Sequence, residues 1–264
     1  MKKVLSIAGS DCSGGAGIQA DIKTITAHKV YAMSVITALT AQNTTGVYGV
    51  LDTPPEFVAK QIDCVMEDIF PDAVKVGMVS SAEIIHVIVH KLSQYKALNV
   101  VVDPVMISTS GSKLLQDDAL RALVDELLPI AKVITPNIPE AEYLSKTEIH
   151  TKDDMVDAAR KISDKYDGYI LVKGGHLEDA ADDLLFRGEE VMWFDGDHIA
   201  NDNTHGTGCT LSSAIACNLA CGYDVKTSVY RAKQYVSGAL ISGLDLGRGS
   251  GPLNHCYAMT DMDS

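Results

Sequence analysis

Short apolar runs of strand length alternate with amphipathic stretches along most of the chain. Runs rich in Val, Ile and Ala are typical of buried strands, whereas apolar residues at spacings of three and four are typical of helices. The pattern predicts strands at Val4–Gly9, Met33–Gln42, Ala73–Met78, Asn99–Val105, Lys132–Asn137 and Tyr169–Gly175. Because helical segments lie between these strands, we expect an α/β fold with a mostly parallel sheet and helices on both faces.

Residues Asp183–Asp197 break this alternation. Two short strand-like runs flank Arg187-Gly188-Glu189, which predicts an antiparallel hairpin at one edge of the sheet. Two helices are expected after it, near Thr210–Cys221 and Val225–Leu244. No repeat, low-complexity stretch or Gly/Ser/Pro-rich linker divides residues 1–264, so the sequence predicts a single domain.

Several predicted strands end in glycine or polar residues, in the segments GSD, AQNTTG, GM, DPV, TPN and KGG. In an open α/β sheet the ligand crevice lies beyond the carboxyl ends of the strands. These groups, which are distant in sequence, are therefore expected to meet at one edge of the sheet and form a single active site.

Composition narrows the classes of function. The chain has 264 residues, 46% of them hydrophobic and 22% charged, and no apolar run approaches the roughly 20 residues of a membrane span. A formal net charge of -13 argues against nucleic acid or an anionic membrane as a partner. The six cysteines form no CxxC pair and no Cys/His cluster, so we expect reduced thiols in a cytoplasmic protein without a zinc site.

The loop AGSDCSGGAGIQAD, residues 8–21, follows the first strand and precedes a helix. Its glycines do not fit GxGxxG and the second strand lacks a terminal acidic residue, which argues against a dinucleotide site. No GxxxxGK[ST] motif occurs, so a P-loop is not expected. Two interpretations of the loop remain. Its glycines serve only a tight turn, or they let a small planar substrate lie against the backbone, with Ala16 or Asp21 lining the pocket.

The segment HGTGC, residues 205–209, precedes a run of small apolar residues at helical spacing. Backbone N–H groups at the start of a helix attract an anion, and the helix dipole adds partial positive charge. The groups concerned are those of Gly206, Thr207, Gly208 and Cys209. A cysteine in this position is expected to have a lowered pKa and to act as a base toward an alcohol. A glycine-rich turn with a structural cysteine is an equal alternative.

Two carboxylates and one lysine follow predicted strands. Asp103 in DPV and Glu140 in NIPE suit Mg²⁺, which commonly takes only one or two protein carboxylates and keeps several waters. Taken singly, each is more often a helix N-cap or turn residue. Lys173 in LVKGGH could neutralise phosphate charge, although a lysine at a strand end is ordinarily solvated.

Taken together, AGSDCSGGAGIQAD, VITALTAQNTTGV, KVGM, VVDPVM, STSG, TPNIPEAE, LVKGGH, NTHGTGCTLSSAIA and GPLNH resemble the hydroxymethylpyrimidine/phosphomethylpyrimidine kinases of thiamine biosynthesis, in the ribokinase-like superfamily. The resemblance runs over nearly the whole chain. It implies a three-layer α/β/α fold, ATP as co-substrate, Mg²⁺ as metal and a homodimer. It also implies two successive phosphorylations, of 4-amino-5-hydroxymethyl-2-methylpyrimidine and then of its monophosphate.

The resemblance also implies roles for single residues. Gln42 matches the family's pyrimidine-binding glutamine, and the pocket wall is matched by Gly9, Ala16, Met78 and Val105. Asn137 and Glu140 match the NxxE magnesium motif. Nucleotide contacts are implied for Asn137, Lys173, Gly206 and Gly208.

One further residue and one segment match the family, and one residue departs from its pattern. Cys209 takes the place where many related sugar kinases carry the catalytic aspartate, and Met106–Leu115 resembles a flap that closes over substrate. Cys12 stands where serine is usual, as a turn residue.

Two other functions remain open on sequence grounds. A pyridoxal kinase of the same lineage shares similar glycine loops and GTGC, and a catalytically silent pyrimidine sensor could use the same fold. Gln42 favours the pyrimidine, because its amide can pair with a ring nitrogen and an exocyclic amine that pyridoxal lacks. The intact GTGC, NxxE and Lys173 favour an enzyme over a sensor.

Overall fold

The computed structural model describes residues 1–106, 115–175, 182–196, 199, 201 and 203–259. Within these ranges one nine-stranded sheet runs in the order β3-β2-β1-β4-β5-β6-β7-β8-β9. The strands are β1 (Lys3–Asp11), β2 (Tyr31–Asn43), β3 (Gly46–Asp52), β4 (Ala73–Val76), β5 (Val100–Val102), β6 (Val133–Ile134), β7 (Tyr169–Val172), β8 (Asp183–Arg187) and β9 (Glu190–Phe194). Neighbouring strands from β2 to β7 pair in parallel, as the sequence predicts.

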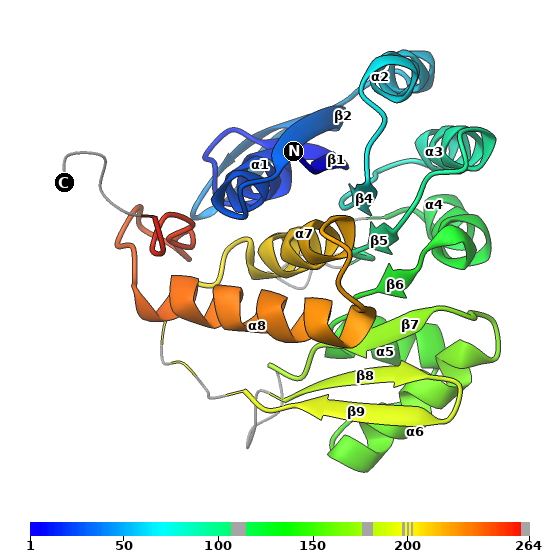
Figure 1. Ribbon diagram of the computed structural model, residues 1–264, viewed down its shortest axis with the longest axis vertical. Helices are drawn as coiled ribbons and strands as arrows, with labels where there is room; N and C mark the ends of the chain where they lie inside the picture. The colour runs from blue at the N-terminus through cyan, green and yellow to red at the C-terminus, as the bar shows by residue number, and fades with distance from the viewer. Residues whose placement is uncertain (107–114, 176–181, 197–198, 200, 202, 260–264) are drawn as a thin grey trace.

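Helices cover both faces of the sheet (Figure 1). One face carries α2 (Pro55–Asp68), α3 (Ala82–Gln94), α4 (Asp117–Ala122), α5 (Ile138–Ser145) and α6 (Lys152–Ser163), and the other carries α1 (Gly17–Ala27), α7 (Thr207–Ala220) and α8 (Val225–Ile241). A π-helical turn (Leu123–Leu127) and a 3-10 turn (Leu128–Ile130) continue α4. The three-layer α/β/α expectation is confirmed.

Strand alternation divides the buried apolar residues into two cores. Val100 and Val102 of β5 pack in the cluster beneath α2 to α6, whereas Val101 between them packs in the cluster beneath α7 and α8. Successive side chains of a strand point to opposite faces. A sheet buried on both faces therefore needs continuous apolar strands, which is why β4 to β7 read as short runs of valine, isoleucine and leucine.

Antiparallel strands occur at both edges of the sheet, whereas the sequence predicts one such edge. The β8–β9 hairpin is the expected one. At the other edge β2 continues to Asn43 and returns as β3, which pairs with it antiparallel. Nearly all of β3 is exposed, so GVYGVLD lacks the alternation of a half-buried strand and gives no strand signal.

Helix α7 begins at Thr207, within the GTGC segment and three residues before the predicted start. Gly206 is its N-cap, in the left-handed region at φ 85°, and its carbonyl accepts the N–H of Thr210 at 2.9 Å. None of the helices in the described ranges combines the length and apolar character needed to cross a bilayer.

Candidate active site

The predicted site residues follow the carboxyl ends of several strands. In the sheet, β1 lies between β2 and β4. The chain continues from β1 to β2 and β3 on one side and later returns to β4 on the other side. The crevice of an open α/β sheet lies at such a switch point. Asp103 directly follows β5, and Lys173 directly follows β7. Asn137, which follows β6, forms a parallel bridge with Lys173. The fold thus brings the strand-end residues to one edge, next to the start of α7.

The first turn of α7 presents backbone N–H groups. The N–H of Thr207 is bound to the carbonyl of Thr204 at 3.2 Å, so it is less available than the sequence suggests. Among the described residues, no backbone carbonyl pairs with the N–H groups of Gly206, Gly208 or Cys209. Free donors at a helix start attract an anion, as expected for an oxyanion hole.

Two glycines allow this turn to pack closely against other loops. A Cβ on Gly206 would lie 1.9 Å from the carbonyl oxygen of Gly15. A Cβ on Gly208 would lie 3.2 Å from Asp103 Oδ2 and 3.3 Å from Lys173 Nζ. The absence of side chains at these positions brings the start of α7 against both the glycine loop and a buried ion pair.

That ion pair joins Lys173 Nζ to Asp103 Oδ1 at 2.9 Å, and the same oxygen accepts from Thr135 Oγ1 at 3.0 Å. Burial acts to raise the pKa of Asp103, but the charges of Lys173 and Lys75 outweigh it and hold the pKa below its usual value. Burial likewise opposes the charge on Lys173, while Asp103 and Glu140 raise its pKa. Both groups therefore stay charged at neutral pH.

Glu140 and Asn137 form a capping box at the start of α5. Asn137 Oδ1 accepts the N–H of Glu140 at 2.9 Å, and Glu140 Oε2 accepts the N–H of Asn137 at 2.8 Å. Burial raises the pKa of Glu140 to about 7; the charge of Lys173 opposes this and that of Asp103 adds to it. The helix-cap interpretation of these residues is therefore realised, in addition to any role with a metal.

The carboxylates suit Mg²⁺ in kind and number. Asp103 and Glu140 supply the oxygen ligands that Mg²⁺ prefers, and they lie near enough for the charge of Asp103 to raise the pKa of Glu140. No cluster of three or more His, Cys, Asp or Glu side chains suited to a metal occurs in the described part of the chain. A sparse pair of this type fits a cation that keeps most of its waters and also binds a triphosphate.

The pKa of the Cys209 thiol differs from the expectation. Burial raises the pKa of its thiol, and although Lys75 opposes this, Asp21 and Asp103 add to it. The predicted lowered pKa is therefore wrong for this structure. The helix start contributes only partial charge, which does not offset the loss of water around the sulfur.

Asp21 does not line the crevice. Its carboxylate is fully buried and binds Lys75 Nζ at 2.8 and 2.9 Å, Ser213 Oγ at 2.8 Å and Ser6 Oγ at 2.5 Å. Because Cys209 and Ser213 lie four residues apart on α7, this ion pair sits one helical turn from the thiol. The expected pocket role is corrected to a structural one, since a buried lysine needs a partner.

The residues of the expected pocket wall lie around the ends of β1, β4 and β5. A Cβ on Gly9 would lie 3.6 Å from Met78 Sδ, so these two residues are neighbours. Ala16 is the N-cap of α1, and Val105 donates its N–H to the carbonyl of Asp103 at 2.8 Å. The expected flap, Met106–Leu115, lies mostly outside the described residues, at 107–114.

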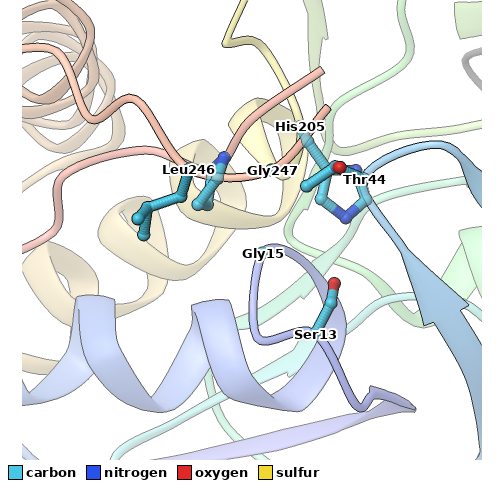
Figure 2. A pocket seen from close by; sticks show the side chains of 7 residues that line it. Ser13, Gly15, Thr44, His205, Leu246 and Gly247 are labelled. Atoms are coloured by element: carbon cyan, nitrogen blue, oxygen red, sulfur yellow. The ribbon is translucent and has the colours of Figure 1, made fainter. Parts of the chain in front are cut away.

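A cavity of about 190 Å³ lies beside the glycine loop (Figure 2). It is lined by Ser13, Gly15, Thr44, His205, Leu246, Gly247 and Pro252. The imidazole of His205 forms part of its wall and also reaches Gln42, whose Nε2 lies 3.3 Å from His205 Nε2. The expected pyrimidine-binding residue therefore contacts a residue of the cavity wall.

Sequence reasoning missed two residues, Asp11 and His205. The Asp11 carboxylate accepts the N–H groups of Ser13, Gly15 and Ala16 and contacts His205 Nε2 at 2.9 Å. Burial acts to raise the pKa of Asp11, but these hydrogen bonds, led by that of His205, hold it below its usual value. A strand-end aspartate before a glycine loop and a histidine before GTGC were the available signals.

The sequence profile of the phosphomethylpyrimidine kinase family matches residues 11–254. The chain is 45% identical to a hydroxymethylpyrimidine/phosphomethylpyrimidine kinase of Streptomyces coelicolor, an alignment that covers 97% of this chain and 95% of that protein. It is 48% identical to the thiamine biosynthesis bifunctional protein ThiED of Geobacter sulfurreducens, of which it spans about half, 53%.

Solved structures of a phosphomethylpyrimidine kinase and of a pyridoxal kinase share the fold. The crystal structure of phosphomethylpyrimidine kinase from Clostridium difficile aligns with a TM-score of 0.82 at 48% identity, over 90% of this chain and 98% of that one. An ADP complex of Bacillus subtilis pyridoxal kinase aligns with a TM-score of 0.89 at 36% identity, over 97% of this chain and 98% of that one. From its sequence and its structure alike, the chain belongs to the phosphomethylpyrimidine kinase family and is a phosphotransferase with the ribokinase-like fold.

Proposed function

We propose that the chain phosphorylates hydroxymethylpyrimidine and then its monophosphate in thiamine biosynthesis, with ATP as the phosphate donor. The observation that carries this proposal is the start of α7, where Gly208 lies beside the Asp103–Lys173 pair and where, among the described residues, the N–H groups of Gly208 and Cys209 have no backbone carbonyl partner. These groups concentrate positive potential locally in a chain of net charge -13. A site of this kind suits a transferring phosphoryl group, whose transition state carries charge on its equatorial oxygens.

Each residue then has a defined task. The N–H groups of Gly208 and Cys209 receive the oxygens of the transferring group, and Lys173 neutralises phosphate charge. The Cys209 thiolate accepts the proton of the substrate alcohol. Mg²⁺, held through Asp103 and Glu140, would neutralise charge on the donor phosphates when bound. A nucleotide donor is supported by the ADP-bound Bacillus subtilis relative.

A substrate panel tests this proposal. Hydroxymethylpyrimidine, its monophosphate and pyridoxal are each incubated with Mg-ATP, and ADP release is measured. We expect both pyrimidines to be phosphorylated with a kcat/KM well above that of pyridoxal, because a site that pairs with an exocyclic amine and the ring nitrogen beside it rejects a ring without that amine. Preference for pyridoxal would contradict the assignment, and no acceptor-dependent ADP release would favour the silent sensor.

A homodimer in the cytoplasm completes the proposal. Six free cysteines suit a reducing compartment. The β2–β3 edge exposes apolar side chains that a second copy would cover, namely those of Leu39, Val47, Tyr48, Val50 and Leu51.

The dimer is tested by light scattering. Leu51 is 68% exposed, so Leu51→Asp is expected to shift the protein toward monomer without unfolding it. Leu98→Asp is the matched control, because Leu98 is 57% exposed but lies away from the β2–β3 edge. A monomeric wild-type protein, or equal dissociation of both variants, would contradict an interface at this edge.

A further inference from the structure

The carboxamide of Gln42 lies between two polar side chains. Its Nε2 is 3.3 Å from His205 Nε2, and its Oε1 is 3.1 Å from Thr40 Oγ1. The backbone of Gln42 is also held, because the Cys12 thiol accepts its N–H at 3.3 Å and donates to its carbonyl at 3.1 Å. The main freedom that remains is a half-turn of the carboxamide, which exchanges its oxygen and nitrogen.

The neighbour on one side is a hydrogen-bond donor. Asp11 Oδ2 lies 2.9 Å from His205 Nε2, and a carboxylate only accepts, so this nitrogen carries a hydrogen. The carboxylate is held in place by three backbone N–H groups of the glycine loop, and Gly15 leaves room for the imidazole, because a Cβ there would lie 2.3 Å from His205 Cδ2. Once protonated, Nε2 has no lone pair that could accept an N–H of the carboxamide, so the matching neighbour is the oxygen of Gln42, which can share the Nε2 hydrogen with Asp11.

The neighbour on the other side is a hydrogen-bond acceptor. Thr40 Oγ1 lies 2.9 Å from the carbonyl oxygen of Ser10, which only accepts, so the single hydroxyl hydrogen of Thr40 points there. Thr40 therefore turns lone pairs toward Gln42, and the matching partner is the nitrogen of the carboxamide. Two independent contacts thus favour the same orientation, with oxygen toward His205 and nitrogen toward Thr40.

We propose that Asp11 and His205 are positioning residues that fix which way round the Gln42 carboxamide faces the substrate. This inference rests on the proposed function, in which Gln42 pairs with the pyrimidine. After contacting His205 and Thr40, the carboxamide keeps one lone pair and one N–H for a ligand. The ring's exocyclic amine then lies on the His205 side and its ring nitrogen on the Thr40 side.

This orientation has a consequence for the reacting group. The hydroxymethyl carbon is attached next to the ring carbon that bears the amine. A ring turned over at Gln42 would therefore carry its alcohol to the wrong side of the pocket. Fixing the carboxamide selects the ring's hydrogen-bonding pattern and also directs the alcohol toward the start of α7.

Substrate discrimination tests the proposal. The 4-oxo analogue of hydroxymethylpyrimidine presents a ring N–H donor and a carbonyl acceptor, the reverse of the 4-amino substrate. We expect the wild-type protein to prefer the amino ring strongly in kcat/KM. His205→Phe removes the N–H, lets the carboxamide turn, and should reduce this preference roughly tenfold or more. His205→Gln keeps a donor near the position of Nε2 and should retain most of it.

The possible results distinguish a failure of this inference from a failure of the proposed function. If His205→Phe lowers kcat/KM for both rings in parallel and leaves their ratio unchanged, His205 is only structural and the inference fails. Should that variant not fold, Asp11→Asn provides the second test, because its amide can donate to Nε2 and turn that nitrogen into an acceptor, which should lower the ratio too. A wild-type protein that phosphorylates neither ring, or a Gln42→Ala variant with an unchanged pyrimidine KM, overturns the proposed function itself and this inference with it.

Discussion

Cys209→Ala is expected to slow the first phosphorylation by about 10² to 10⁴, the range typical of losing a general base, and the second by much less. The first acceptor is a neutral alcohol, which must lose a proton as it attacks. The second acceptor is a phosphate monoester, whose second pKa is about 6, so it is already an anion at neutral pH. Initial rates with each acceptor supplied separately at saturating ATP measure the difference.

The pH dependence of the two steps provides the control. Because burial raises the pKa of Cys209, most of the thiol is protonated at neutral pH. A base works in its deprotonated form, so the first rate should rise with pH, about tenfold per unit below the thiol pKa, and level off above it. The second rate should stay nearly flat above about pH 7. Equal losses in both steps, or a first step insensitive to pH, would show that Cys209 shapes the pocket instead.

Gly206→Ala is expected to slow both phosphorylations by about 10² to 10³, the loss typical of a damaged oxyanion hole. The added Cβ would lie 1.9 Å from the carbonyl oxygen of Gly15, so the start of α7 must move away from the glycine loop. Both acceptors receive the same phosphoryl group, and both steps should therefore suffer alike. Rates with each acceptor test this, alongside thermal unfolding to check that the variant is folded.

Gly222→Ala is the matched control for this substitution. Gly206 and Gly222 have similar left-handed φ angles of 85° and 93°, but a Cβ on Gly222 would meet nothing within 4 Å. Both variants therefore carry a backbone cost of about 1 to 2 kcal/mol, and only one displaces the anion hole. Similar activity in the two variants would contradict a phosphate site at Gly206–Cys209.

The layered fold was predictable because strands buried on both faces leave a plain signal. Runs such as VVV and YILV are continuous in apolar residues and short, so they indicate parallel strands covered by helices. Strand β3 was not predictable in the same way, because its exposed side chains follow no burial pattern. Its place depends on pairing with β2, which is a long-range interaction that no local pattern reports.

The candidate site, like the fold, has a part that the sequence predicts and a part that it does not. That Asp103, Lys173 and Gly208 lie together follows from the rule that strand ends meet at one edge, and the structure places them together. The surroundings of Cys209 could not be predicted, because the balance between burial and the Asp21–Lys75 charges depends on packing. Lys75 within AVKV was the one available hint, since a charge inside an apolar strand requires a buried partner.

Two parts of the chain contribute different groups to the crevice. Apart from Val105, the groups expected to contact the ring, from Gly9 to Met78, come from the part of the chain up to the end of β4, whereas Lys173 and the start of α7 come from its second half. Substitutions in the early strands can therefore alter which alcohol is accepted while phosphoryl chemistry stays intact. Acceptor choice and phosphoryl transfer therefore depend largely on separate parts of the sequence.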